Sequence, residues 1–232
     1  MMAQEALLPS NSLRTVNEIV QDTIEFSRSN SSDPVEVLRY YQKKVVTGRN
    51  IDVESERGIS GDKSTNFIIV NRFKLLETSF DEINAIEDLR KTLEVEFYSE
   101  KAQDYGGPRK EFFVLVLREL KEKYFDNGLK EHMAEDYETV GKIMALSMLQ
   151  NGKLPRFLNA DIISQLLTDD PATPCIVHLR KGLDALGIYQ LFRGIPTFHY
   201  LFQVNEASAL TMRKLMHLLK PIFSEEGSNV RT

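Results

Sequence analysis

The sequence contains a single cysteine, Cys175, and no apolar run long enough to cross a membrane. One cysteine excludes an internal disulfide, which fits a reducing compartment. The longest apolar run, residues 112–117, is far shorter than the roughly 20 residues that a spanning helix needs. The first residues have no basic flank followed by an apolar core, the pattern of a secretory signal. We expect a cytoplasmic or nuclear protein with no membrane partner.

Signals for metal, phosphate and nucleic-acid binding are also missing. The net charge of -5 gives no reason to expect nucleic acid as a partner. Gly106-Gly107 lacks the Lys-Ser/Thr of a phosphate loop, and Pro108 removes an amide that would bind phosphate. The histidines have no cysteine or carboxylate at metal-ligand spacing; they are His132, His178, His199 and His217. We therefore expect no metal and no cofactor.

What is present is the composition of a globular domain, with 42% hydrophobic and 27% charged residues in 232. An amphipathic helix is predicted at residues 16–26, followed by a polar linker at 27–34. We expect residues 1–34 to form this N-terminal helix and linker, and residues 35–232 to form the main domain. The main domain begins with a helix, because Asp33 can cap it and Pro34 suits its first position.

The remaining pattern predicts many helices and few strands. Residues 67–70 are apolar on both faces, which predicts a strand covered on both sides. The helix around residues 140–149 is apolar nearly all round, so we expect it in the middle of the domain. Helices are predicted at about residues 74–91, 108–124, 129–150, 160–167, 176–192 and 210–220. The fold class is therefore α+β, mainly helical, with a few short strands.

One continuous run predicts a strand, a turn and a helix start. The strand covers residues 93–98, where apolar Leu93, Val95 and Phe97 alternate with glutamates and give one buried face. Gly106 or Gly107 is expected to have a positive φ angle, because the chain turns sharply there.

The helix that follows this turn is expected to begin near Pro108. Its buried face should include Phe112 and either Leu115 or Val116. Asp104 can bond the amides of the glycine turn, and Arg109 and Glu111 flank the helix start, which is a structural role rather than a catalytic one.

This run resembles the core signature of the HECT-type ubiquitin ligases. In that signature a strand ending in Phe-x-x-Glu leads through Asp-x-Gly-Gly into a helix that starts with a basic residue, Glu, Phe and Phe. The matching residues are Phe97, Glu100, Asp104, Gly106, Gly107, Lys110, Glu111, Phe112 and Phe113. Residues 67–83 and 140–157 agree with the family in order and spacing. Residues 223–231 resemble a point late in the first, N-terminal lobe of a divergent branch.

The resemblance implies a particular chemistry. In the family, a cysteine accepts ubiquitin from a conjugating enzyme as a thioester, and a substrate lysine then attacks that thioester. This cysteine lies in a second lobe, which we expect downstream of Thr232, so the chain should stop before the catalytic lobe and be inactive alone. The implied partners are a ubiquitin-conjugating enzyme and ubiquitin; the protein substrate stays open.

Cys175 has to be weighed as a nucleophile of its own, because His178 follows at helical spacing. The favoured interpretation is a packed, unreactive cysteine that starts a helix after Pro174, since lone cysteines usually behave as small hydrophobes. We therefore predict no catalytic residue in this chain.

The chain also departs from the family. Most members insert a subdomain that docks the conjugating enzyme after the region matching residues 155–167, and here only residues 168–174 precede the next helix. If docking survives, an apolar and aromatic segment is its predicted surface: Tyr189, Leu191, Phe192, Ile195, Phe198 and Tyr200. The alternative is that these are core residues.

Two functions from different classes follow. The first is the scaffold lobe of a HECT-type ubiquitin-protein ligase. The second is a non-enzymatic interaction module that kept this lobe and lost the catalytic one. A third alternative is an unrelated helical domain that matches the family by chance.

Overall fold

The structure is a computed structural model that describes residues 14–51, 64–100, 106–168 and 173–203. Within these ranges the helices are α1 (Val16–Ser29), α2 (Pro34–Val45), α3 (Leu75–Ala85), α4 (Gly107–Leu120), α5 (Asp136–Leu149), α6 (Ala160–Leu167), α7 (Pro174–Asp184) and α8 (Ile188–Gly194). The strands are β1 (Asn66–Val70) and β2 (Leu93–Phe97). The mainly helical α+β class is confirmed. Asp104, the helix predicted at 210–220 and residues 223–231 lie outside the described residues.

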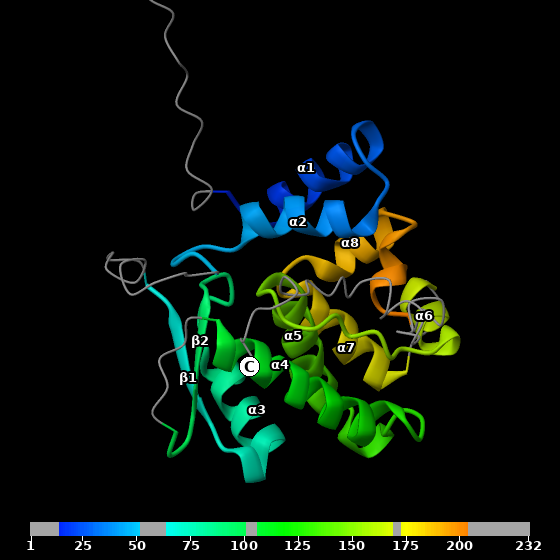
Figure 1. Ribbon diagram of the computed structural model, residues 1–232. Helices are drawn as coiled ribbons and strands as arrows, with labels where there is room; N and C mark the ends of the chain where they lie inside the picture. The colour runs from blue at the N-terminus through cyan, green and yellow to red at the C-terminus, as the bar shows by residue number, and fades with distance from the viewer. Residues whose placement is uncertain (1–13, 52–63, 101–105, 169–172, 204–232) are drawn as a thin grey trace, which may run out of the picture.

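The two strands form a parallel sheet in which Asn66 lies opposite Leu93 and Val70 opposite Phe97. Helix α3 connects the strands, and α3 and α4 pack against the same side of the sheet (Figure 1). On β2 the predicted alternation is confirmed, because the three apolar residues are buried and the glutamates between them are partly exposed. None of the helices in the described ranges has the length and apolar character needed to cross a membrane.

The prediction for β1 is wrong in one respect. Ile68 and Val70 are buried, but Phe67 and Ile69 are 53% and 42% exposed. The strand is therefore covered on one side only. The physical reason is that helices pack against the inner face of this two-stranded sheet and leave the outer face in contact with solvent.

Helix α5 runs through the middle of the domain, as predicted, and nearly all of its residues are buried. It packs against α7 at backbone distance. A Cβ atom added at Gly182 would lie 2.0 Å from the carbonyl oxygen of Glu138, and one at Gly141 would lie 2.7 Å from that of Leu179. Both glycines are needed because no side chain fits between the two helices.

Helix α1 is longer than predicted and includes the start of the stretch taken as a linker. Its Ile19 and Val20 are fully buried, and it packs on α2 and α8. Helix α2 begins as predicted, with the Asp33 carboxylate accepting a hydrogen bond from the Val35 amide at 2.8 Å. The division of the chain at residue 34 stays a prediction.

Candidate functional site

The signature run folds as a strand, a turn and a helix. Gly106 has φ 110°, so the predicted positive φ angle is confirmed there. Helix α4 begins at Gly107 with Pro108 in its first turn. Phe112 and Val116 are fully buried, which confirms the predicted helix face.

Arg109 is a residue whose position the sequence did not predict. Its side chain is fully buried. Its Nη1 donates to the carbonyl of Leu93 at 2.9 Å, its Nε to that of Gln150 at 3.2 Å, and its Nη2 to that of Ile51. The guanidinium therefore joins the start of β2, the end of α5 and the loop after α2. The sequence placed Arg109 beside the helix start but did not indicate its burial, because its acceptors lie in other parts of the chain.

Gln150, which no sequence pattern singled out, completes this junction. Its Oε1 accepts a hydrogen bond from the Leu93 amide at 2.8 Å, and its Nε2 donates to the Lys91 carbonyl at 3.1 Å. The side chain is 1% exposed. A buried amide with both ends bonded fixes the distance between α5 and the first residue of β2.

Three further signature residues, Phe97, Glu100 and Glu111, contact the side chain of Arg72. Its guanidinium makes two hydrogen bonds to the Glu100 carboxylate, at 2.5 and 3.0 Å, and one to Glu111 at 2.8 Å. It also lies over the Phe97 ring at 3.7 Å. The residues before and after the glycine turn are thereby held together by one cation. The hydrogen bonds from Arg72 lower the pKa of Glu100 below its ordinary value.

Cys175 lies near the start of α7 and is fully buried. Burial, and then the nearby Glu131 carboxylate, raises the pKa of its thiol. His178 faces the Glu138 carboxylate at 3.9 Å. A buried thiol with a raised pKa forms little thiolate, so it is a poor nucleophile. This geometry supports the packed-cysteine interpretation.

The segment predicted as a partner surface is mostly core. Leu191, Phe192, Ile195 and Phe198 are at most 3% exposed. Tyr200 is 56% exposed, and Tyr189 is partly buried with its hydroxyl donating to the Leu166 carbonyl. For these four buried residues the alternative interpretation, that they belong to the core, is therefore correct. Docking through the two tyrosines stays a prediction.

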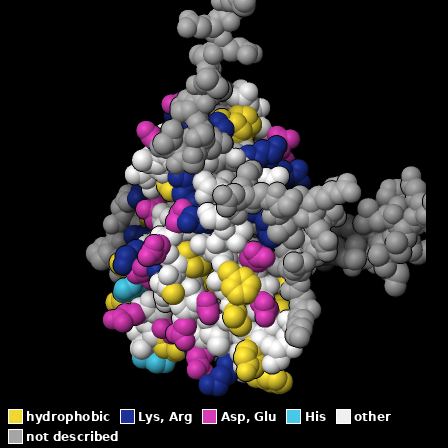
Figure 2. Space-filling model, turned by 90° about the vertical axis from the view of Figure 1, so that its left-hand side faces the viewer, with side chains coloured by type: hydrophobic (Ala, Val, Ile, Leu, Met, Phe, Trp, Pro, Cys, Tyr) yellow, Lys and Arg dark blue, Asp and Glu magenta, His cyan; other side chains and the backbone are white. Residues whose placement is uncertain are grey.

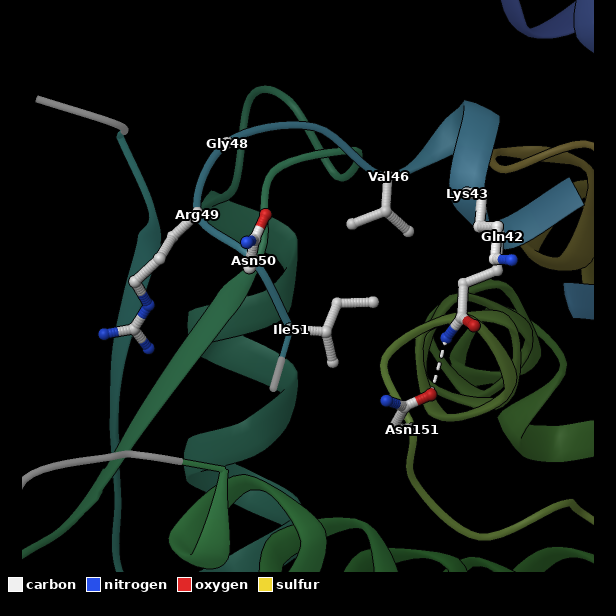
Figure 3. Close-up of a pocket in the computed structure, with 8 residues that line it drawn as sticks. All are labelled: Gln42, Lys43, Val46, Gly48, Arg49, Asn50, Ile51 and Asn151. Atoms are coloured by element: carbon white, nitrogen blue, oxygen red, sulfur yellow. Dashed lines mark hydrogen bonds between the residues drawn. The ribbon is translucent and has the colours of Figure 1, made fainter. Parts of the chain in front are cut away.

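A cavity of about 320 Å³ lies between the end of α2, the loop that follows it and the end of α5 (Figure 3). The Gln42 side chain forms part of one wall of this cavity. Its Nε2 donates to the Leu149 carbonyl at 2.7 Å and to Asn151 Oδ1 at 2.8 Å. The Arg49 guanidinium points away from the cavity and pairs with Glu94 at 3.5 Å. None of the lining residues that the structure describes is a carboxylate, histidine or cysteine, so no acid–base or nucleophilic pair is found among them. Within the described ranges, no cluster of three or more such side chains could hold a metal ion.

Comparison with known proteins relates about half of the chain to one class, the E3 ubiquitin-protein ligases. It is 37% identical to HECW2 of Homo sapiens over 117 residues, which is 49% of this chain and 7% of that protein. It is 36% identical to human HECW1 over 111 residues, or 44% of this chain and 7% of HECW1. RSP5 of Saccharomyces cerevisiae is 24% identical over 137 residues, or 51% of this chain and 16% of RSP5. No family model matches the chain.

The resemblance to HECT-type ubiquitin ligases is thus confirmed for about half of the chain. The matched part covers less than a fifth of each of these relatives. Which lobe the chain forms stays a prediction.

Proposed function

We propose that this chain is the scaffold lobe of a HECT-type ubiquitin-protein ligase. The observation that carries the proposal is the structure of the signature run. In it, helix α4 packs against strand β2, and Glu100 and Glu111 both accept hydrogen bonds from Arg72. Similarity to three ubiquitin ligases over about half of the chain supports it. In this role the run is a structural support and not a catalytic centre.

In the parent protein, a cysteine thiolate would attack the thioester that joins ubiquitin to a conjugating enzyme. The conjugating enzyme leaves as its thiolate, and ubiquitin is then bound to the ligase. A substrate lysine amine attacks this second thioester, forms an amide and releases the ligase thiolate. We infer that the accepting cysteine lies downstream of Thr232, because the thiol of Cys175 is buried and its pKa is raised.

The partners of the parent are then a conjugating enzyme, ubiquitin and a protein substrate. Nucleic acid and membranes have no part in this proposal. The site of action would be the cytoplasm or the nucleus.

The test is an adduct assay with the 232-residue chain, activating enzyme, charged conjugating enzymes and ubiquitin. We expect no adduct that a thiol reagent removes, whereas a longer form of the parent with the second lobe should form one. The control is Cys175→Ser, which should leave both results unchanged. A thiol-sensitive adduct on the 232-residue chain that disappears in Cys175→Ser would contradict the proposal.

One observation favours the alternative, a non-enzymatic interaction module. Helix α6 ends at Leu167 and α7 begins at Pro174, so the place where most of the family carries its docking subdomain is very short. The two functions predict different parent proteins, one with the second lobe and one without it. A parent with no second lobe, and with no ubiquitin transfer in the same assay, would establish the module.

A further inference from the structure

Strand β1 has one edge that the sheet does not use. The Asn66 amide donates to the Thr92 carbonyl at 2.9 Å, and the Val70 carbonyl accepts from the Tyr98 amide at 2.8 Å. In a parallel pair, alternate residues direct both main-chain groups to the same neighbour. The N–H and C=O groups of Phe67 and Ile69 therefore point to the opposite edge. Among the described residues none makes a hydrogen bond to them.

The side chains of this edge are also open to solvent. Phe67 is 53% exposed and Ile69 is 42% exposed on the outer face. Figure 2 shows several hydrophobic side chains, interspersed with carboxylates, on the side of the molecule that carries the sheet. Natural edge strands are usually protected by lysine, proline or a bulge, and the sequence of β1, Asn-Phe-Ile-Ile-Val, contains no charge and no proline. Such an edge is a template for another strand.

A groove of about 290 Å³ adjoins the beginning of β1. Asn66 and Phe67 of β1 line it, together with the carboxylates Glu82, Glu87 and Asp88. None of these three carboxylates forms an ion pair with a described residue. Lys91 is the one cation among the described lining residues, so the carboxylates outnumber the cations in this part of the groove. A cationic ligand would be attracted to it.

We propose that the free edge of β1 binds an extended segment of a partner protein by strand addition, and that this segment carries lysine or arginine. Main-chain hydrogen bonds to Phe67 and Ile69 would hold the segment, and apolar side chains at alternate positions would cover the exposed pair. The uncompensated carboxylates select a basic segment. A second copy of the chain fits less well, because β1 itself has no cation. The edge would take such a segment whether or not the parent transfers ubiquitin.

The probe is a fluorescein-labelled peptide, Val-Lys-Val-Lys-Val-Lys-Val, added to the full chain and followed by fluorescence anisotropy. We expect saturable binding that weakens with salt. Two peptides serve as controls: the same sequence with glutamate in place of lysine, and the lysine peptide with every amide N-methylated. Both should bind at least about tenfold more weakly, since the first loses the charge match and the second loses its main-chain donors.

Two variants and a matched control locate the site. Ile69→Pro removes an outward N–H without removing a bond to β2, and Phe67→Lys adds a charge to the edge. Each should weaken binding about tenfold or more, with an unchanged circular dichroism spectrum. The matched control is Val177→Lys, a change at a residue on α7 that is 51% exposed, which should bind as the original does.

The charge contribution is tested by Glu82→Gln combined with Glu87→Gln, against Glu25→Gln on the exposed side of α1. Only the first should weaken binding and reduce its salt dependence. Equal binding of the lysine and N-methylated peptides would overturn the proposal. So would a dimer, measured by analytical ultracentrifugation, that Phe67→Lys dissociates, because the edge would then join two copies of this chain.

Discussion

The two faces of the β1–β2 sheet have opposite environments in the structure, although strand β1 has two apolar side chains on each face. On the inner face, Ile68, Val95 and Phe97 are at most 3% exposed under α3 and α4. On the outer face, Phe67 and Ile69 remain largely exposed beside the glutamates of β2. Apolar character therefore decides burial only where another element is available to cover the strand. The inner face therefore contributes to stability, whereas the described residues leave Phe67 and Ile69 of the outer face exposed.

The largest contrast is expected for lysine on the two faces. Val95→Lys places an ammonium where 1% of the side chain is exposed, which should cost about 4 kcal/mol or more of unfolding free energy. Ile69→Lys should change it by only about 0.5 kcal/mol, because the new charge stays in water. Urea denaturation of both variants measures the difference. Equal losses would show that the outer face is covered.

The next effect concerns α4, which packs against β2. Phe112→Ala should cost about 3 to 5 kcal/mol, because the side chain is fully buried and its removal leaves a cavity. The matched control is Val114→Ala on the exposed side of the same helix, with an expected change of about 0.5 kcal/mol or less. A loss below about 1 kcal/mol for Phe112→Ala, from the denaturation midpoint, would mean that this helix face is assigned wrongly.

The glycine turn between β2 and α4 allows a comparison of two neighbouring alanine substitutions, with a smaller expected change in stability. Gly106→Ala should cost about 1 to 2 kcal/mol, because its φ angle of 110° is strained for a residue with a Cβ atom. Gly107→Ala should be neutral or stabilising by about 0.5 kcal/mol, since the glycine is helical and has open space around it. Thermal unfolding of the pair tests the turn. If both alanines behave alike, the left-handed conformation at Gly106 is not required.

The smallest effect belongs to Arg72, at the exposed end of the sheet. Its hydrogen bonds lower the pKa of Glu100 below 4.5 in the folded protein. The contribution to stability is then complete above about pH 4.5 and is lost as the pH falls through the folded pKa. In the Arg72→Gln variant the pKa of Glu100, measured by NMR titration of its carboxyl carbon, should return toward 4.5. An unchanged pKa would show that Arg72 does not hold this carboxylate in solution.

Local patterns predicted the elements whose environment is set by their own sequence. The alternation of β2, the turn at Gly106 and the cap at Asp33 all follow from neighbouring residues. The helix predicted at 176–192 is interrupted, because Gly187 has φ 69° and separates α7 from α8. A glycine in a helical pattern does not reveal this by itself.

Features that depend on distant contacts could not be predicted. Residues 67–70 have the composition of a strand covered on both faces, and nothing local indicates that helices cover one face only. The burial of Arg109 and Gln150 was not predicted, because their partners lie in other parts of the chain. The candidate partner segment at 189–200 shows the same limit, since most of its aromatic and aliphatic side chains are buried.

The hydrogen bonds of Arg109 have a consequence for how this domain can vary. Its acceptors at Ile51, Leu93 and Gln150 are all main-chain carbonyls, which every amino acid supplies. Substitutions at those three positions leave the acceptors in place, whereas no other side chain offers the same fork of donors as arginine. These three bonds therefore require the arginine and make no demand on the side chains of Ile51 and Leu93, whereas the Gln150 side chain is needed for its own bonds to Leu93 and Lys91.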